Sequence, residues 1–454
     1  MARSTPDWPA LQGAIAGEVV PADSPGYDAA RKPAIANFED VRPQAVALCE
    51  TAADVAEVIS FAARLGLPTA ARSGGHCFAG RSSTEGIVID VTPMSSVSVS
   101  GDIATIGAGA RLGDIYEALG EHGLTIPAGC GPTVGIAGLT LGGGFGILGR
   151  SYGLTSDQLL EAQVVLADSR VVECDEHRHE DLFWALRGAG ADGLGVVTSL
   201  VFRTVPAPEA TSFHLTWPHS DAVAVIAAWQ AWAPAGPDEL AASLLVTAGG
   251  DESEPPLVHL FGAMIGSEAD TVGLLEELVA RAGVDPASES LTHLPYAQTK
   301  RHLDDHSPGE DRPGHMFSKS EFFRRPLPAD SIAALIEDLA DGRTASESRD
   351  LDFSPWGGAY NRTRPDATAF VHRDALFVLK HGLVVDPGAP SGVRESARRW
   401  LARSWASVHP WGTGGVYPNF PDPDLNGSAR AYHGANLDRV RRIRASYEFV
   451  PPDR

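Results

Sequence analysis

The chain has 454 residues, of which 43% are hydrophobic and 21% charged. This length exceeds one ordinary hydrophobic core, so we expect two domains in a soluble globular protein, without a membrane span. The 58 acidic residues against 36 basic ones give a net charge of -22. This balance argues against non-specific binding to nucleic acid or to an anionic membrane, and it favours small-molecule partners.

The cysteine pattern and the amino terminus both favour a cytoplasmic protein. Four cysteines, Cys49, Cys77, Cys130 and Cys174, are too few for a disulfide scaffold and lack the short paired spacings of a zinc site. No metal site is therefore expected. The first 32 residues contain no basic start followed by an apolar core and a cleavage site, so we predict no secretory signal.

Short strands alternate with amphipathic helices over the first two hundred residues. Thr51 is a typical N-cap, and the apolar spacing after it predicts a helix that ends before Gly66 and Pro68. Residues 112–123 predict another helix. Strands are expected at 68–72, 87–91, 103–107, 161–167 and 195–204.

The proline-containing segment 205–210 has the composition of a linker, and we place a domain boundary there. Beyond it, strands are predicted at 213–217, 239–247, 256–266, 349–358 and 374–382, with helices near 221–232, 267–282, 328–341 and 391–406. Long strands without strict helix alternation favour a largely antiparallel sheet covered by helices, an α+β domain.

The segment ARSGGHCFAG, residues 71–80, carries the first chemical signal. A glycine pair after a strand lets backbone amides approach a phosphate, Arg72 could add a fixed charge, and His76 would lie beside the ligand. The alternative is a tight turn with a surface histidine.

A second signal is the tract 129–154, in which ten of 26 residues are glycine. Such a backbone must lie against something flat or charged, because this much glycine costs folding entropy. Gly144, Gly146 and Gly149 satisfy GxGxxG, and Asp168 has the spacing of a nicotinamide fingerprint. Because neither a good strand before it nor an amphipathic helix after it is predicted, we reject that interpretation.

Several motifs in a fixed order cover nearly the whole chain: YDAARK, RSGGH, PTVGIAGLTLGGGFG, RSYGLTSDQ, DLFWALRGAGADGLGVVTSL, ATAFVHRDALF and VYPNFPDPDL. Together they resemble the berberine-bridge-enzyme-like FAD-linked oxidases, which share the vanillyl-alcohol-oxidase-type fold. The resemblance implies a two-subdomain FAD-binding domain at 1–207 and a substrate domain at 208–408. Residues 409–454 would return to the FAD-binding domain.

The resemblance also implies FAD bound between the subdomains and linked covalently through His76. The expected cofactor-binding residues are Arg72, Ser73, Gly74, Gly75, His76, Cys77, Cys130, Thr133, Val134, Gly135, Gly138, Gly142, Gly143, Gly144, Gly146, Gly153, Asp157, Gly195, Val197 and Asn419. A simple turn is the alternative for each single glycine outside the GGG core.

Three positions depart from the family pattern. Gly131 stands where relatives with a second flavin bond carry cysteine, and Cys130 lies one residue earlier, so we predict a single bond through His76 and leave a second one through Cys130 open. The usual GNFG has become residues 192–195, Asp-Gly-Leu-Gly. Ser354 occupies a place where relatives often carry a catalytic acid or a tyrosine, and serine is a poor base.

Tyr417, in a Y-x-N motif with Asn419, is therefore the expected catalytic base. Its phenol would need a nearby positive charge, or would have to pass its proton on, to act at neutral pH. The alternative is a hydroxyl that only hydrogen-bonds the flavin edge. His372 and Arg373 are candidates for catalysis or for core packing, and Tyr296, Trp356, Tyr360 and Lys380 for the substrate pocket or the core.

The resemblance predicts hydride transfer from a C–H bond of an alcohol or sugar-like substrate to FAD, with dioxygen as acceptor and hydrogen peroxide released. Val134 lies near the position that controls gas access in the family. The alternatives are an amine oxidase of the hydroxynicotine-oxidase type and a flavin-binding protein without turnover. A monomer or homodimer is expected.

Overall fold

The computed structural model describes residues 6–190, 193–251, 253–305, 314–425 and 427–447. In it, the first predicted helix forms as α3 (Ala52–Leu65). Thr51 Oγ1 accepts the Asp54 amide at 3.1 Å, and Asp54 accepts the Thr51 amide in return. Gly66 ends the helix with φ 63°, a left-handed conformation that suits glycine. Local chemistry alone therefore fixes both ends of α3.

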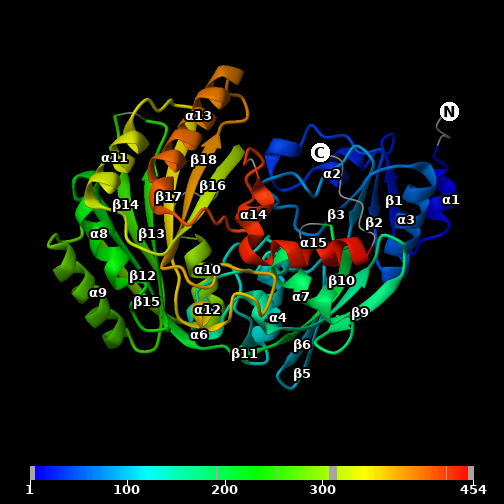
Figure 1. The fold of residues 1–454 in the computed structure, drawn as a ribbon, viewed down its shortest axis with the longest axis horizontal. Coiled ribbons are helices and arrows are strands. Elements are labelled where there is room, and N and C mark those ends of the chain that lie inside the picture. Colours follow the sequence, from blue (N-terminus) through cyan, green and yellow to red (C-terminus); the bar gives the residue numbers. More distant parts are fainter. Residues whose placement is uncertain (1–5, 191–192, 252, 306–313, 426, 448–454) are drawn as a thin grey trace.

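Two sheets form the amino-terminal half, on the right of Figure 1. The first has the order β1-β2-β4-β3: β1 (Glu18–Pro21) pairs antiparallel with β2 (Ala45–Leu48), and β2, β4 (Ile87–Asp90) and β3 (Thr69–Arg72) pair in parallel. The second, β5-β6-β10-β8-β9, is antiparallel and consists of β5 (Val97–Ser100), β6 (Ile103–Gly107), β10 (Val196–Arg203), β8 (Leu159–Val165) and β9 (Val171–Asp175). The strands predicted before residue 205 are thus confirmed.

The glycine-rich tract contains two short helices, α5 (Ile136–Leu141) and α6 (Gly149–Tyr152). The GxGxxG spacing therefore follows a helix, whereas a nicotinamide fingerprint follows a buried strand and opens a long helix. The structure supports our rejection of that interpretation.

The segment predicted as a linker is ordered. Val205–Pro206 pairs as β11 with β7 (Leu124–Thr125), and β12 (Glu209–Pro218) begins three residues later. Pro206 is tolerated in β11 because proline cannot donate a backbone hydrogen bond, and a strand of two residues needs few of them. The chain therefore enters the second sheet through paired backbone.

The second half is built on one seven-stranded antiparallel sheet, β15-β12-β14-β13-β17-β18-β16. The strands not yet given are β13 (Leu240–Ala248), β14 (Leu257–Ile265), β15 (Ser288–Pro295), β16 (His315–Phe323), β17 (Glu347–Pro355) and β18 (Phe377–Val385). Strands β15 and β16 were not predicted. The predicted α+β class is confirmed.

Four predicted helices cover one face of this sheet, on the left of Figure 1: α8 (Ala222–Trp232), α9 (Glu268–Ala282), α11 (Ala329–Ala340) and α13 (Ser391–Val408). Alternate residues of β17, including Leu351 and Phe353, join the core beneath these helices. The residues between them face the opposite side of the sheet, because side chains alternate along a strand.

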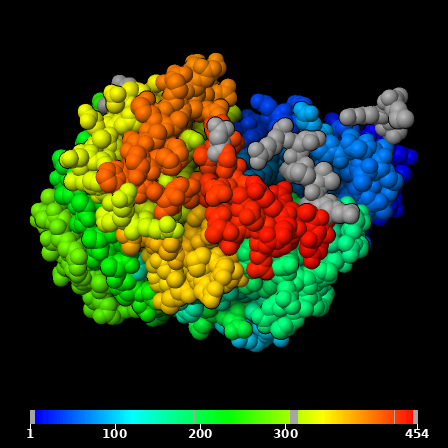
Figure 2. Space-filling model, viewed as in Figure 1, coloured from blue at the N-terminus to red at the C-terminus, as the bar shows by residue number. Residues whose placement is uncertain are grey.

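The last described helix lies on the amino-terminal half. Helix α15 (Leu437–Ser446) packs against α7 (Glu180–Ala189), where Arg439 bonds Asp181 at 2.7 Å and lies 4.0 Å from the Trp184 ring centroid. Figure 2 shows this segment, in red, at the junction of the two halves. No described helix combines the length and apolar character that a membrane crossing requires.

Candidate active site

The two glycine-rich segments predicted to bind the cofactor lie directly against each other. A Cβ atom at Gly74 would lie 2.3 Å from the Gly135 amide nitrogen, so only glycine allows this approach. Gly75 adopts φ 73°, and Ser73 Oγ donates to the Ala108 carbonyl at 2.7 Å. The turn after β3 and the loop before α5 thus form a single cradle of backbone.

A cavity of about 2440 Å³ opens on this cradle and extends to the seven-stranded sheet. A drug-sized ligand needs roughly 300–1,000 Å³, so the cavity has room for a long cofactor together with a second molecule. The predicted site residues that line it are Arg72, Ser73, Gly74, Gly75, His76, Cys77, Cys130, Thr133, Val134, Gly135, Gly138, Gly146, Gly195, Val197, Tyr417 and Asn419.

Five predicted cofactor residues lie behind the cavity wall: Gly142, Gly143, Gly144, Gly153 and Asp157. A Cβ at Gly142 would overlap the Asn419 side chain, and one at Gly143 would meet the Phe370 ring. The structure therefore gives these glycines a close-packing role that supports the wall.

Asp157 is engaged with the chain itself. Arg373 binds its carboxylate through two hydrogen bonds of 2.7 Å, and the Leu154 amide donates to it at 2.9 Å. Gly153, with φ 94°, packs against the same side chain. We therefore assign Asp157 and Arg373 to the support of the glycine tract rather than to cofactor contact.

The Arg72 guanidinium is also used internally. It donates to the carbonyls of Ala30, Arg31 and Ser82 at 2.8–3.1 Å, and the residue is 4% exposed. This corrects the expectation that Arg72 offers its charge to a phosphate. It instead ties the cradle to the chain before α3.

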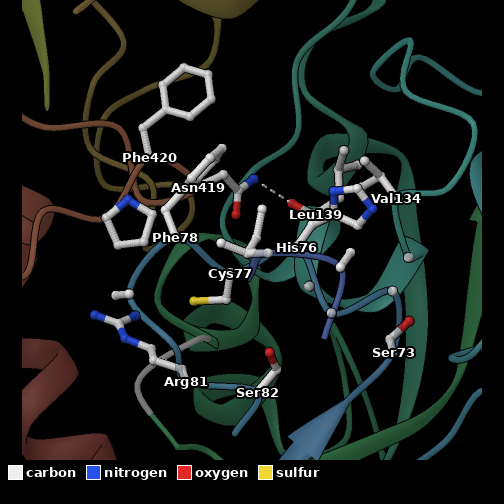
Figure 3. Close-up of a pocket in the computed structure, with 18 of the residues that line it drawn as sticks. Ser73, His76, Cys77, Phe78, Arg81, Ser82, Val134, Leu139, Asn419 and Phe420 are labelled. Carbon is white, nitrogen blue, oxygen red and sulfur yellow. Dashed lines mark hydrogen bonds between the residues drawn. The ribbon is translucent and has the colours of Figure 1, made fainter. Parts of the chain in front are cut away.

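His76 projects from the cradle with its imidazole ring beside Val134 (Figure 3). Its Nε2 atom lies 3.0 Å from Thr133 Oγ1. Burial lowers the pKa of His76, and the Arg111 charge lowers it further. The imidazole is therefore held neutral, with Nδ1 left as its other ring nitrogen for bonding.

Cys130 also lines the cavity, but its sulfur contacts a buried lysine. Lys300 Nζ lies 3.7 Å from the Cys130 Sγ and donates to the carbonyls of Ala128 and Gly129 at 2.8 and 2.9 Å. The ammonium also lies 4.7 Å from the Tyr116 ring centroid. Lys300 thereby fixes the loop that carries Cys130, a role that the sequence did not predict.

The Tyr417 hydroxyl lies where the two halves meet. It accepts the Gly144 amide at 3.1 Å and Asn419 Nδ2 at 3.0 Å, while Asn419 also donates to the Leu139 carbonyl. Both donors favour a phenolate, but burial raises the Tyr417 pKa above its ordinary value. The positive charge that we expected a catalytic base to need is not among the causes of its pKa shift.

The other polar candidates divide between core and cavity. His372 stacks on Phe322 at 4.5 Å, and burial lowers its pKa to about 3. Together with Trp356 it belongs to the packed junction, which confirms the core alternative for both. Tyr360 lines the cavity and donates to the Gly146 carbonyl at 3.1 Å. Tyr296 is buried against Tyr116.

Sequence reasoning missed two carboxylates, Asp350 and Asp352, that line the cavity from β17. Ser354 follows on the same face and donates to Asp352 Oδ1 at 3.2 Å, and Lys380 of β18 lies opposite Asp352. The period-two pattern of Asp350, Leu351, Asp352 and Phe353 could have revealed them, because it places both carboxylates on the face away from the helices.

The amino-terminal half matches the model of the FAD binding domain over residues 43–175. The uncharacterized FAD-linked oxidoreductase YgaK of Bacillus subtilis is 32% identical, over 96% of this chain and 94% of that protein. The solved structure of BBE-like 1 from Physcomitrella patens superposes with a TM-score of 0.88 at 26% identity, covering 99% of this chain and 98% of that one.

A solved structure of glucooligosaccharide oxidase from Acremonium strictum also matches, with a TM-score of 0.86 and 26% identity over 98% of this chain and 99% of that one. That enzyme is described as carrying a 6-S-cysteinyl, 8α-N1-histidyl FAD.

Fold, cradle and cavity define an FAD-linked oxidoreductase. The chain belongs to the berberine-bridge-enzyme-like family of FAD-linked oxidases. FAD fits the site, because the two backbone segments that pack together at Gly74 and Gly135 line a cavity with room for a long cofactor, and His76 projects from them. When bound, FAD supplies the ring that accepts a hydride.

Proposed function

We propose that this protein oxidises a hydroxyl-bearing carbon of a saccharide-like substrate and passes the electrons to dioxygen, releasing hydrogen peroxide. The observation that carries the proposal is that one cavity contains the glycine cradle, His76, Tyr417 and a polar wall of the seven-stranded sheet. The oligosaccharide named in the Acremonium strictum relative supports a saccharide-like substrate. A cytoplasmic location and a monomeric or dimeric state stay predictions.

The cradle would hold the cofactor in two ways. Backbone amides of Ser73–Cys77 would offer donors to a pyrophosphate, and His76 would hold the flavin covalently through Nδ1, with Thr133 hydrogen-bonded to Nε2. Neutral imidazole is the nucleophilic form, so the lowered pKa of His76 suits this role.

Tyr417 handles the proton of the substrate hydroxyl. Because burial raises its pKa, the phenol enters the reaction protonated and must act as a relay. Its oxygen takes the substrate proton as its own proton leaves to water in the cavity. The Gly144 amide and Asn419 compensate the negative charge that develops on the oxygen.

Anaerobic mixing of the holoenzyme with oligosaccharides, secondary alcohols and amines tests this proposal. We expect oligosaccharides or alcohols to bleach the flavin absorbance, and air to restore it with one peroxide formed per product. Bleaching by amines alone would instead indicate an amine oxidase, which needs no proton relay from a hydroxyl. No bleaching by any class would indicate a flavin-binding protein without turnover.

A further inference from the structure

The polar wall of the cavity contains a carboxylate pair, Asp350 and Asp352, facing one ammonium. Asp350 lies opposite Gly382 and Asp352 opposite Lys380 in the β17–β18 ladder. Lys380 Nζ lies 3.8 Å from Asp350 Oδ1 and 3.6 Å from Asp352 Oδ2. These distances exceed that of a hydrogen bond, so the ammonium is shared between the two carboxylates.

This group is built into the sheet rather than spread over a flexible surface. The three side chains are only 20–25% exposed. A Cβ atom at position 382 would lie 2.1 Å from Asp350 Oδ2, so Gly382 provides the space that the carboxylate occupies. Ser354 fixes the second carboxylate by donating to Asp352 Oδ1.

The carboxylate pair carries more negative charge than Lys380 balances. Asp350 Oδ1 is inaccessible to solvent and has no hydrogen-bond partner within the described chain. Burial raises the pKa of Asp350; the Lys380 charge opposes this shift, and the Asp352 charge adds to it. A buried anion of this kind gains most from a second cation with N–H donors.

The pair lies close to the proposed reaction centre. Lys380 Nζ is 5.4 Å from the centroid of the Phe420 ring, and that ring is 5.0 Å from the Tyr417 ring. A substrate whose hydroxyl meets Tyr417 therefore extends past Phe420 to the carboxylate pair within one or two sugar units. A metal ion is a poorer occupant, since no group of three possible metal-ligating side chains gathers among the described residues.

We propose that Asp350 and Asp352 form a subsite for a protonated amino group, so that the preferred substrate is an amino-substituted saccharide or alcohol. The inference rests on the proposed oxidase function and specifies its substrate class. The ammonium group of such a substrate donates hydrogen bonds to both carboxylates. It also compensates the negative charge that Lys380 leaves unbalanced. A neutral sugar can make the hydrogen bonds but leaves that charge unbalanced.

Three matched disaccharides test this: cellobiose, the dimer of glucosamine and the dimer of N-acetylglucosamine. Anaerobic flavin reduction is measured with each, at a pH where the free amine is protonated. We expect the second-order rate constant for the glucosamine dimer to exceed that for the other two by at least about tenfold. Asp350→Asn and Asp352→Asn should each reduce this preference, and Lys380→Gln should increase it.

Asp285→Asn, which changes an exposed carboxylate of the same domain, is the matched control and should leave the preference intact. Equal rate constants for charged and neutral dimers, or a preference that survives both aspartate changes, would overturn the inference. If no dimer reduces the flavin, the proposed function fails instead. Titration of the oxidised holoenzyme, followed by the flavin spectrum and by calorimetry, then decides whether the glucosamine dimer still binds more tightly through Asp350 and Asp352.

Discussion

The Gly144 amide donates to the Tyr417 hydroxyl at 3.1 Å, which joins the glycine tract of the first half to the segment that returns from the second. A tyrosine that only filled space would not need this donor. We predict that Tyr417→Phe lowers the rate of anaerobic flavin reduction by about two to four orders of magnitude, the usual effect of losing a positioned acid–base group. The FAD content should not change.

Tyr152→Phe is the control for this substitution, because Tyr152 is 38% exposed. A Tyr417→Phe enzyme that reduces its flavin at the normal rate would exclude the proton relay. An amine substrate would then become the better interpretation.

The contact between Cys130 and Lys300 underlies our prediction of a single covalent bond. The sulfur lies one residue from the expected register and is engaged by the buried ammonium. Cys130→Ser should therefore leave the flavin absorption spectrum nearly unchanged. A proteolytic flavin peptide joined to both His76 and Cys130, detected by mass spectrometry, would refute the single bond and make this protein similar to the Acremonium strictum enzyme in that respect.

Val134 lines the cavity in the loop that carries Thr133, and we predict that it leaves a path for dioxygen. Val134→Ile adds one methylene to this wall and should slow reoxidation of the reduced flavin severalfold while sparing its reduction. Stopped-flow mixing of the reduced enzyme with dioxygen measures the first rate directly. The exposed Val171→Ile is the control, and equal reoxidation rates in all three proteins would exclude the role of Val134.

Acid sensitivity should come partly from His259, which bonds His214 and Thr247 at 3.0 Å. Burial, and then the neighbouring His214, lower the pKa of His259 to about 4. In the unfolded chain its pKa is about 6.5, so below that pH the unfolded state binds a proton that the folded state refuses. The contribution of His259 to the free energy of unfolding therefore decreases by about 3 kcal/mol as the pH falls from about 6.5 to 4.

His259→Gln should remove this part of the acid loss. Urea unfolding at pH 7 and at pH 4.5 gives the difference in unfolding free energy for each protein, and we expect a smaller difference in the variant. His177→Gln, at a side chain that is 83% exposed, should keep the difference of the parent. If the unfolding free energy changes equally between pH 7 and pH 4.5 in the parent and in both variants, His259 does not contribute to the acid sensitivity.

The elements that the sequence predicted are those whose signals are local. The capping box at Thr51 and the glycine at 66 mark α3 without reference to the rest of the chain. Strand β16 was missed because it carries Lys319 and Glu321 into the interior, where they bind Asp422 and His409 from far along the chain. Strand β15 was missed because it is a polar, largely exposed edge strand.

The predictions for the site divide in the same way, between local signals and contacts that are distant in the sequence. Motifs identified the cradle and Tyr417, because glycine spacing and the Y-x-N order are visible in one dimension. The sequence did not show that Arg72 and Asp157 bind other parts of the chain, since their partners are 41 and 216 residues away. Of the altered GNFG segment, Asp192 lies outside the described residues, while Gly195 lines the cavity with φ 102°.

The covalent bond at His76 tests the whole account most directly, because it requires the cradle, the cofactor and the neutral imidazole together. Acid precipitation followed by protease digestion should leave the flavin on one peptide that contains His76, while His76→Ala should bind FAD reversibly and release it into the supernatant. Wild-type protein that releases all its flavin on precipitation, or a flavin peptide without His76, would contradict the account.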